Sequence, residues 1–234
     1  MPLPFFYIPS PIELEEAIQL DEETSRHISG VLRMKKGETL QLTDGKGYLA
    51  IAEIVDDHKK KCIVRIQKAN TQQRRSRCIT IAISLTKNSN RFEWFLEKAT
   101  EIGINEIIPM ICERTEKEKF RMDRMQNILV SAMLQSQQTW LPVLSHPVSF
   151  TDIIQTSSHQ KKFIAHCMDN EKSKLQDLTN ADQTKIILIG PEGDFTPSEI
   201  NSAIQHLFLA VTLGESRLRT ETAGVVAATL LQLS

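Results

Sequence analysis

Apolar and polar positions divide the chain into two differently patterned parts. Up to about residue 70, short apolar runs are separated by turn residues. Residues 39–43 alternate with period two, residues 44–47 (DGKG) are a hairpin-turn signal, and residues 48–52 and 62–66 are further strand candidates. Residues 21–32 carry a helical apolar stripe. This part of the chain therefore predicts a small β domain with one helix.

From residue 79 onward the pattern changes to alternating strands and helices. Residues 79–85 and 186–189 are continuous apolar runs, which is typical of strands covered on both faces. Further strands are predicted at 104–111, 163–166 and 209–213, and amphipathic helices at about 91–102, ended by Gly103, and at 122–138. This alternation predicts a mostly parallel α/β sheet. Because residues 72–77 are polar and unpatterned, we expect domains at 1–73 and 74–234.

The most informative stretch runs from residue 185 to residue 199. A buried strand leads into the loop GPEG, and Thr196, Pro197 and Glu199 then form a helix start with a capping box. The carboxyl ends of strands in open α/β sheets are where ligands bind. Residues 209–222 repeat the strand, glycine loop and helix, so the two loops can face one pocket. Neither loop matches the dinucleotide or triphosphate motif, and two ordinary turns are the alternative.

Local charge points to nucleic acid although the overall charge does not. The chain of 234 residues has a net charge of -1, which excludes a strongly basic protein. Residues 59–91, however, hold ten Lys and Arg and no Asp or Glu. Such a segment is often a solvated linker, but beside a β domain it favours binding of RNA phosphates. The RNA-binding candidates are Arg26, Arg33, Lys59, Lys60, Lys61, Arg74, Arg75, Arg77, Lys87 and Arg91.

Cysteine spacing and hydropathy limit the cellular compartments in which the protein can be expected. The four cysteines are far apart and show no CxxC or Cys/His ligand spacing, so we expect free thiols in a reducing cytosol and no metal. The N-terminus lacks a signal-peptide pattern, and no apolar run reaches the roughly 18 residues that a membrane span needs. We therefore expect a cytoplasmic protein without a membrane segment.

Four motifs in the same order carry a family resemblance. They are HISGVLRMKKGETLQLTDGKG, the pattern from Lys87 and Arg91 to EIG at 101–103, IGPEGDF, and LGESRLRTETA. Together they resemble the bacterial 16S ribosomal RNA uridine N3-methyltransferases of the SPOUT superfamily, over nearly the whole chain. The resemblance implies a PUA-like, OB-type small β-barrel that binds RNA. It also implies a SPOUT-type parallel sheet with a C-terminal trefoil knot, S-adenosyl-L-methionine as cofactor, a homodimer, and the small ribosomal subunit as partner.

The resemblance also implies site residues. The expected cofactor-binding residues are His166, Leu188, Ile189, Gly190, Glu192, Gly193, Leu213, Gly214, Leu218 and Arg219. Three positions depart from the family pattern: Asp194 replaces a glycine, while Ser216 and Gln138 replace arginines. Arg217, one position after Ser216, is the candidate to replace the loop arginine.

Methylation of uridine N3 requires loss of the imide proton and in-line placement of the nitrogen. We expect Arg219 to stabilise charge on the uracil carbonyls, and Glu221 or His166 to accept the proton. For Glu221, a first-turn acid favoured by the helix dipole is the better explanation of the sequence. Three alternatives stay open: a SPOUT enzyme acting on another base or a ribose, a non-catalytic RNA-binding ribosome assembly factor, and a nucleotide-binding enzyme unrelated to RNA.

Overall fold

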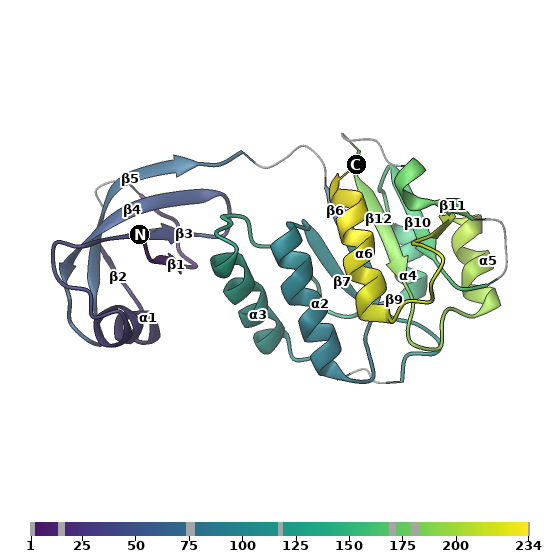
Figure 1. Cartoon of the computed structure of the whole chain (residues 1–234), viewed down its shortest axis with the longest axis horizontal. Helices are drawn as coiled ribbons and strands as arrows, with labels where there is room; N and C mark the ends of the chain where they lie inside the picture. The colour runs from purple at the N-terminus through teal and green to yellow at the C-terminus, as the bar shows by residue number, and fades with distance from the viewer. Residues whose placement is uncertain are drawn as a thin grey trace. The chain divides into compact units, whose positions relative to one another are not determined.

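The structure is a computed structural model that describes residues 3–13, 17–73, 78–116, 119–168, 172–178 and 183–233. The chain forms two compact units (Figure 1). The N-terminal domain comprises Met1–Arg74 and Met133–Leu141, and the C-terminal domain comprises Arg75–Ala132 and Pro142–Ser234.

The N-terminal domain is built on one curled, five-stranded sheet. Its strand order is β1-β3-β4-β5-β2, with β1 (Phe5–Tyr7), β2 (Ala17–Gln19), β3 (Thr39–Thr43), β4 (Tyr48–Asp56) and β5 (Ile63–Thr71). β1 pairs with β3 in parallel, and the other pairs are antiparallel. The edge strands β1 and β2 do not pair with each other in the described residues. The predicted PUA-like β domain is therefore confirmed, as a half-barrel.

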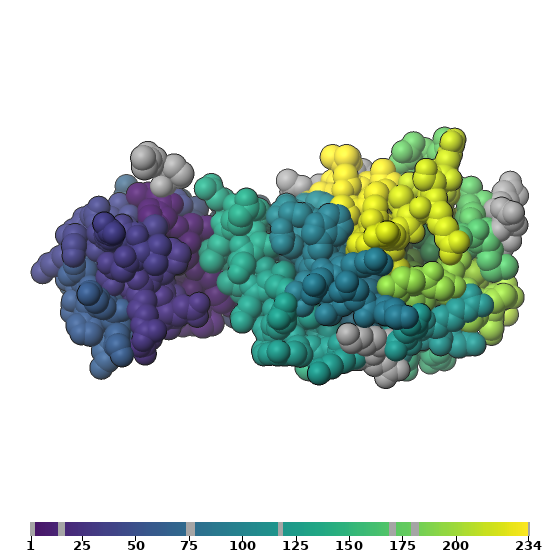
Figure 2. Space-filling model, turned by 60° about the horizontal axis from the view of Figure 1, so that its bottom comes forward, coloured from purple at the N-terminus to yellow at the C-terminus, as the bar shows by residue number. Residues whose placement is uncertain are grey.

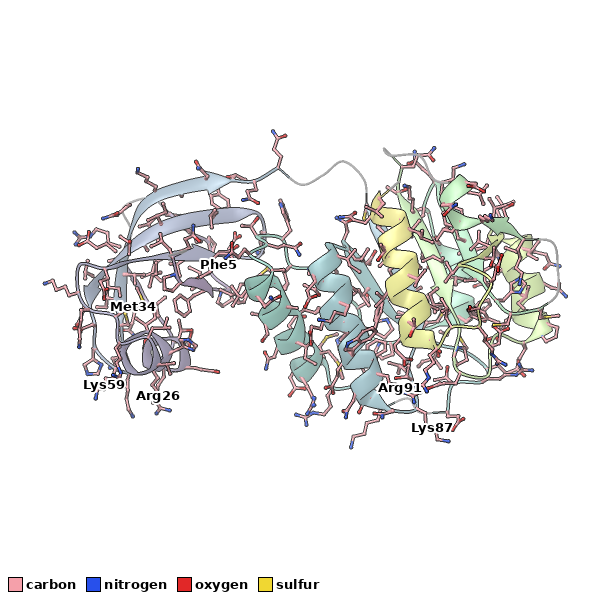
Figure 3. The ribbon with its side chains drawn as sticks, in the orientation of Figure 1. Phe5, Arg26, Met34, Lys59, Lys87 and Arg91 are labelled. Carbon is pink, nitrogen blue, oxygen red and sulfur yellow. The ribbon has the colours of Figure 1, made fainter. Side chains whose placement is uncertain are left out.

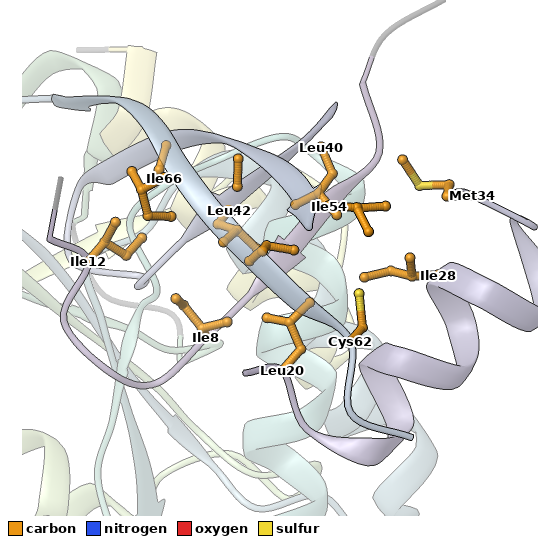
Figure 4. Packing of buried hydrophobic residues seen from close by; sticks show 13 residues of the cluster. Ile8, Ile12, Leu20, Ile28, Met34, Leu40, Leu42, Ile54, Cys62 and Ile66 are labelled. Carbon is orange, nitrogen blue, oxygen red and sulfur yellow. The ribbon is translucent and has the colours of Figure 1, made fainter. Parts of the chain in front are cut away.

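A continuous apolar core fills the concave side of this sheet (Figure 4). Leu40 and Leu42 of β3 and Ile54 of β4 are fully buried, as period-two alternation requires. Helix α1 (Glu22–Arg26) begins at the N-cap Asp21 and continues as a π-helical turn, η1 (His27–Val31), which adds Ile28 to the core. The predicted helix at 21–32 is confirmed, although its second half is a π turn.

The turn at residues 44–47 is held by a distant segment. The Gly47 N–H donates to the Thr139 carbonyl at 2.9 Å, and the Leu141 N–H donates to the Gly45 carbonyl at 2.8 Å. Residues 133–141 therefore pack with the N-terminal domain. The second predicted amphipathic helix is α3 (Met122–Gln135), which ends three residues earlier than expected.

The C-terminal domain contains an eight-stranded sheet in which every pairing of the described residues is parallel, as predicted. Its order is β11-β13-β10-β12-β6-β7-β8, and β9 also pairs with β7. The strands are β6 (Ile79–Ser84), β7 (Glu106–Ile111), β8 (Val143–Leu144), β9 (Val148–Ser149), β10 (Lys161–Ala165), β11 (Ser173–Lys174), β12 (Lys185–Ile189) and β13 (Leu209–Thr212). All five residues of β12 are buried, which explains its lack of polar alternation.

Helices cover both faces of this sheet. α4 (Phe150–Thr156) and α5 (Pro197–Gln205) share a core cluster with Ile186 and Leu188 of β12. α2 (Ser89–Ile102) and α6 (Thr220–Leu233) lie side by side and contact each other, and α6 also contacts β6 and β12 (Figure 1). A short 3₁₀ helix, η2 (Leu175–Leu178), contacts α6. The arrangement is a SPOUT-type α/β layer structure.

The C-terminal helix returns across the loop that follows β12. β13 pairs with β10 on the side away from β12, yet α6 packs on β6 and β12. Thr220 Oγ1, at the start of α6, donates to the Gly190 carbonyl at 3.0 Å. A trefoil knot requires such a crossing, and the knot itself stays a prediction.

Gly224 allows α6 to approach α2 and β6 closely. A Cβ atom at this position would lie 2.6 Å from Phe95 Cε2 and 2.8 Å from Ile83 Cδ1. The Phe95 ring is fully buried and has no room to move. The contact therefore requires glycine, even though glycine is a poor helix former.

Gly224→Ala is expected to lower the unfolding free energy of the C-terminal domain by about 1–2 kcal/mol. Overpacking of this kind costs about 1–3 kcal/mol, of which up to about 1 kcal/mol is offset by the higher helix propensity of alanine. Urea unfolding followed by circular dichroism measures the loss. Gly30→Ala is the control, because a Cβ at Gly30 meets nothing within 4 Å. Equal midpoints for the two variants would contradict the close contact.

Candidate active site

Two adjoining cavities lie at the carboxyl ends of β10, β12 and β13. The first has a volume of about 440 Å³ and is lined mainly by the β12–α5 loop and residues 217–220. The second, of about 410 Å³, is lined by the end of β10 and residues 211–218. Both are lined by Ala165, Cys167, Arg217, Leu218 and Ala223. The second glycine loop, residues 213–219 between β13 and α6, therefore separates them. In Figure 2 the yellow C-terminal segment lies beside the yellow-green β12–α5 segment.

The β12–α5 loop ends in the predicted capping box. Thr196 Oγ1 accepts from the Glu199 N–H at 3.2 Å, and Glu199 Oε2 accepts from the Thr196 N–H at 2.8 Å. Glu199 also accepts the Glu113 N–H through Oε1 at 2.9 Å. Its carboxylate therefore holds the loop to the end of β7 as well as starting α5.

Two further contacts fix the first glycine loop, the GPEG turn at residues 190–193 of the β12–α5 loop. The sequence contains no signal for these contacts. Arg114 Nη1 donates to the Gly193 carbonyl at 2.8 Å, and Glu192 Oε1 accepts from the Lys87 N–H at 3.1 Å. These partners are 79 and 105 positions apart in the chain. Only the parallel order of β7, β6 and β12 brings them together, so Arg114 was not among the predicted site residues.

Asp194 is a clamp between two strand ends. Its φ angle of 62° lies in the left-handed region, which glycine adopts without strain and aspartate tolerates. Oδ2 accepts from the Cys167 N–H at 2.9 Å, and Oδ1 accepts from its neighbour Phe195 N–H at 2.9 Å. The departure from glycine therefore keeps the backbone conformation and adds a link from the β12–α5 loop to the end of β10.

His166 is buried in the wall of the second cavity with a relative exposure of 6%. Neither ring nitrogen has a hydrogen-bond partner within the described part of the chain. Burial, and to a lesser extent the nearby Lys172 ammonium, lowers the pKa of His166, whereas Asp194 opposes the shift. The ring is therefore neutral at pH 7, with a donor and an acceptor available to a ligand.

Glu221 and Arg91 meet beside the first cavity. Arg91 lines this cavity, and its Nε lies 3.7 Å from Glu221 Oε1. Glu221 is 6% exposed, and its Oε2 has no hydrogen-bond partner among the described residues. The carboxylate therefore faces a cation that comes from a different helix.

The predicted cofactor residues are distributed unevenly between the cavities and the core. Ile189, Gly190, Glu192, Leu218 and Arg219 line the first cavity, and His166, Leu213, Gly214 and Leu218 line the second. The Leu188 side chain is fully buried in the core with α4 and α5, because alternate residues of β12 point to opposite faces. Gly193 does not line either cavity, and its carbonyl is bound by Arg114.

The other two departures from the family pattern, Ser216 and Gln138, also have clear places. Ser216 lines only the second cavity, whereas Arg217 lines both. Gln138 belongs to the segment that packs with the N-terminal domain, where its Nε2 donates to Ser136 Oγ at 3.0 Å.

The predicted RNA-binding residues form two groups (Figure 3). In the N-terminal domain, Arg26 and Lys60 both pair with Glu22. Arg33, Lys59 and Lys61 are exposed. In the C-terminal domain, Lys87 pairs with Glu116 at 2.7 Å, and Arg91 lies at the first cavity. Arg74, Arg75 and Arg77 lie outside the described residues.

Within the described residues, no group of three or more His, Cys, Asp or Glu is placed to hold a metal ion. The same residues include no helix with the length and hydropathy of a bilayer span.

Comparisons with known proteins agree with these features. Residues 73–232 match the RNA methyltransferase domain family, and residues 20–67 match the RNA methyltransferase PUA domain family. The ribosomal RNA small subunit methyltransferase E of Buchnera aphidicola (subspecies Acyrthosiphon pisum) is 30% identical over 98% of this chain and 93% of its own length. The chain belongs to the ribosomal RNA small subunit methyltransferase E family.

Solved structures of two relatives match at full length. A probable rRNA-methyltransferase from Porphyromonas gingivalis shares 39% identity, with a TM-score of 0.91 over 99% of both chains. The family member from Neisseria gonorrhoeae, bound to S-adenosyl methionine, shares 29% identity. Its TM-score is 0.89 over 99% of this chain and 97% of its own. The cofactor of the family is thus S-adenosylmethionine.

The residues of the two cavities fit this cofactor. Volumes of about 440 and 410 Å³ are within the usual range of ligand sites, about 300–1,000 Å³. Glycines at 190 and 214 expose the backbone to a ligand, and the unpartnered ring of His166 offers hydrogen bonds. Burying polar groups without a hydrogen-bond partner is unfavourable. A bound polar ligand would therefore supply the hydrogen bonds that the described residues do not give to the His166 ring.

Asp194→Ala is expected to weaken S-adenosylmethionine binding about tenfold, because alanine loses the clamp on Cys167 and strains the left-handed backbone. Asp194→Gly loses only the clamp, so its affinity should lie between those of wild type and Asp194→Ala. Isothermal titration calorimetry measures both. Glu97→Ala, a change on the outer part of α2, is the control. Unchanged affinity in Asp194→Ala would show that the clamp is dispensable.

Affinity for S-adenosylmethionine is expected to fall only at a pH below the ordinary titration range of histidine, because His166 has a lowered pKa and stays neutral above it. Protonation places a positive charge next to a cofactor that carries a sulfonium cation. His166→Gln should flatten this dependence. His159→Gln should retain it, although burial also lowers the pKa of His159. A wild-type pH curve in His166→Gln would contradict this role of His166.

Proposed function

We propose that this protein transfers a methyl group from S-adenosylmethionine to uridine N3 of 16S ribosomal RNA in the small subunit. The family membership supplies the reaction class and the RNA. The observation that supports the N3 position is the first cavity, where Arg91 and Arg219 line the wall and Glu221 lies behind Arg91. Cations and a carboxylate suit a substrate that must lose a proton and hold the resulting negative charge.

The chemistry at N3 explains the cations. The imide nitrogen is not nucleophilic until its proton leaves, and the charge then spreads over N3 and the two flanking carbonyl oxygens. Arg219 is exposed at the cavity wall and stabilises this charge. When bound, S-adenosylmethionine supplies an electrophilic methyl group. Most of the rate enhancement then comes from holding the base in line with that group.

Glu221 is the proton acceptor in this proposal. The N3–H bond breaks, its electron pair stays on the uracil ring, and the proton moves to Oε2. This oxygen has no hydrogen-bond partner among the described residues. Glu221 lies behind Arg91 and does not itself line the cavity, so the proton reaches it only past the Arg91 side chain. His166 is the other predicted acceptor, but it lines the second cavity, where it is better placed to hold the cofactor.

The N-terminal domain holds the RNA in this proposal. Arg26, Arg33 and Lys59–Lys61 contact phosphates, together with the basic segment that includes Arg74, Arg75 and Arg77. Sequence-specific RNA recognition acts on unstacked bases, so the target uridine must leave its stack to enter the cavity. We also propose that the protein acts as a homodimer in the cytoplasm.

Incubation with S-adenosylmethionine and small subunits from a strain that lacks the modification tests the function. Nucleoside mass spectrometry should detect N3-methyluridine. Methylated ribose or another methylated base would assign a different SPOUT reaction. Absence of any methylation despite cofactor binding would favour a non-catalytic assembly factor.

Arg219→Ala is expected to slow methylation by about 100- to 1,000-fold, the usual effect of removing one stabilising donor from a developing negative charge. Single-turnover kinetics at saturating cofactor measures the chemical step. Arg121→Ala is the control, because Arg121 is exposed, pairs with Asp123 and lines neither cavity. A wild-type rate in Arg219→Ala would remove this residue from the mechanism.

A further inference from the structure

Arg91 occupies a position that the electrostatics of its helix disfavour. It is the third residue of α2, which begins at Ser89 after the N-cap Asn88. The N-terminus of a helix carries a partial positive charge, so an acid is favoured there and a cation is not. The first turn of α2 contains no acid. A cation at this place therefore depends on a partner from another element.

Glu221 is that partner. It lies in the first turn of α6, where a carboxylate is favoured, and its Oε1 is 3.7 Å from Arg91 Nε. The Glu221 side chain is 8% exposed, while that of Arg91 is 36% exposed. The buried Glu221 carboxylate thus holds the Nε end of the Arg91 guanidinium. The rest of the Arg91 guanidinium is available at the cavity surface.

Arg91 and Arg219 line the same cavity, together with Gly190 and Thr220. A uracil that loses its N3 proton carries negative charge on two carbonyl oxygens, one on each side of N3. A guanidinium offers a planar set of donors that suits such an oxygen. Arg217 lines this cavity too, but it also lines the second cavity, so Arg91 and Arg219 are the two arginines that line the first cavity alone. These two arginines match the two charged oxygens of one base.

We propose that Arg91 is a second catalytic cation, which binds one carbonyl of the target uracil while Arg219 binds the other. Glu221 positions Arg91 through Oε1 and takes the N3 proton on Oε2. This inference rests on the proposed function, and it assigns Arg91 to the base instead of to an RNA phosphate. In the balanced step, the N3–H bond breaks and the proton forms a bond to Glu221. The N3–CH₃ bond then forms as the sulfur–methyl bond breaks, and its electron pair goes to sulfur.

Substitution of Arg91 separates a base contact from a phosphate contact. Arg91→Gln should lower the single-turnover rate by about 100- to 1,000-fold at saturating RNA, with S-adenosylmethionine affinity unchanged. Arg91→Lys keeps the charge and should restore part of the rate. Lys98→Gln is the matched control on the same helix, because Lys98 pairs with Glu97 and Glu101 and lines neither cavity.

The pH–rate profile is the second readout. Loss of a cation raises the pKa of the bound imide, so the profile of Arg91→Gln should shift to higher pH, whereas that of Lys98→Gln should not. The other charged groups that line this cavity are Glu192, Asp194, Arg217 and Arg219, which both variants retain. An unshifted profile in Arg91→Gln would overturn the proposal.

A phosphate role predicts a different pattern. Arg91→Gln would then raise KM for the RNA, weaken the salt dependence of binding and leave the saturated rate unchanged. That result would also overturn the proposal. The wild-type enzyme in the same assay tests the proposed function separately, because N3-methyluridine from wild type with a normal Arg91→Gln rate contradicts only the role of Arg91.

Discussion

The hydrogen bond from Thr220 Oγ1 to the Gly190 carbonyl joins the two halves of the site. It is 3.0 Å long, and Thr220 is 5% exposed, so the bond is protected from water. One partner ends the central strand β12, and the other begins α6. One turn further along α6, Gly224 allows the helix to approach Phe95 and Ile83 closely. The two glycine loops therefore form one site only because the C-terminal helix returns across the sheet.

Around this junction, hydrogen bonds from charged side chains connect the ends of neighbouring strands. The Asp194 carboxylate links the β12–α5 loop to β10, and Glu199 and Arg114 link the same loop to β7. Each of these hydrogen bonds joins a charged side chain to a backbone group. Such a bond is stronger than one between two neutral groups. The result is a preorganised site, with the Arg91–Glu221 pair beside it.

The sequence predicts the elements of this architecture better than its contacts. Continuous apolar runs identify β6 and β12, and the Thr196–Glu199 capping box locates the start of α5, because these signals are local. The clamp by Arg114, the core position of Leu188 and the packing of residues 133–141 depend on partners far apart in the chain. The sequence identifies Asp194 as a departure from the family pattern, but its role depends on the position of the Cys167 N–H.

The most direct test of this account is a crystal structure with S-adenosylmethionine and uridine monophosphate. The account predicts a cofactor that contacts both glycine loops and His166. It also predicts uracil carbonyls within hydrogen-bond distance of Arg91 and Arg219, with N3 facing the methyl group and Glu221 Oε2 near N3. A uracil bound away from these arginines, or a cofactor that leaves the second loop uncontacted, would contradict it.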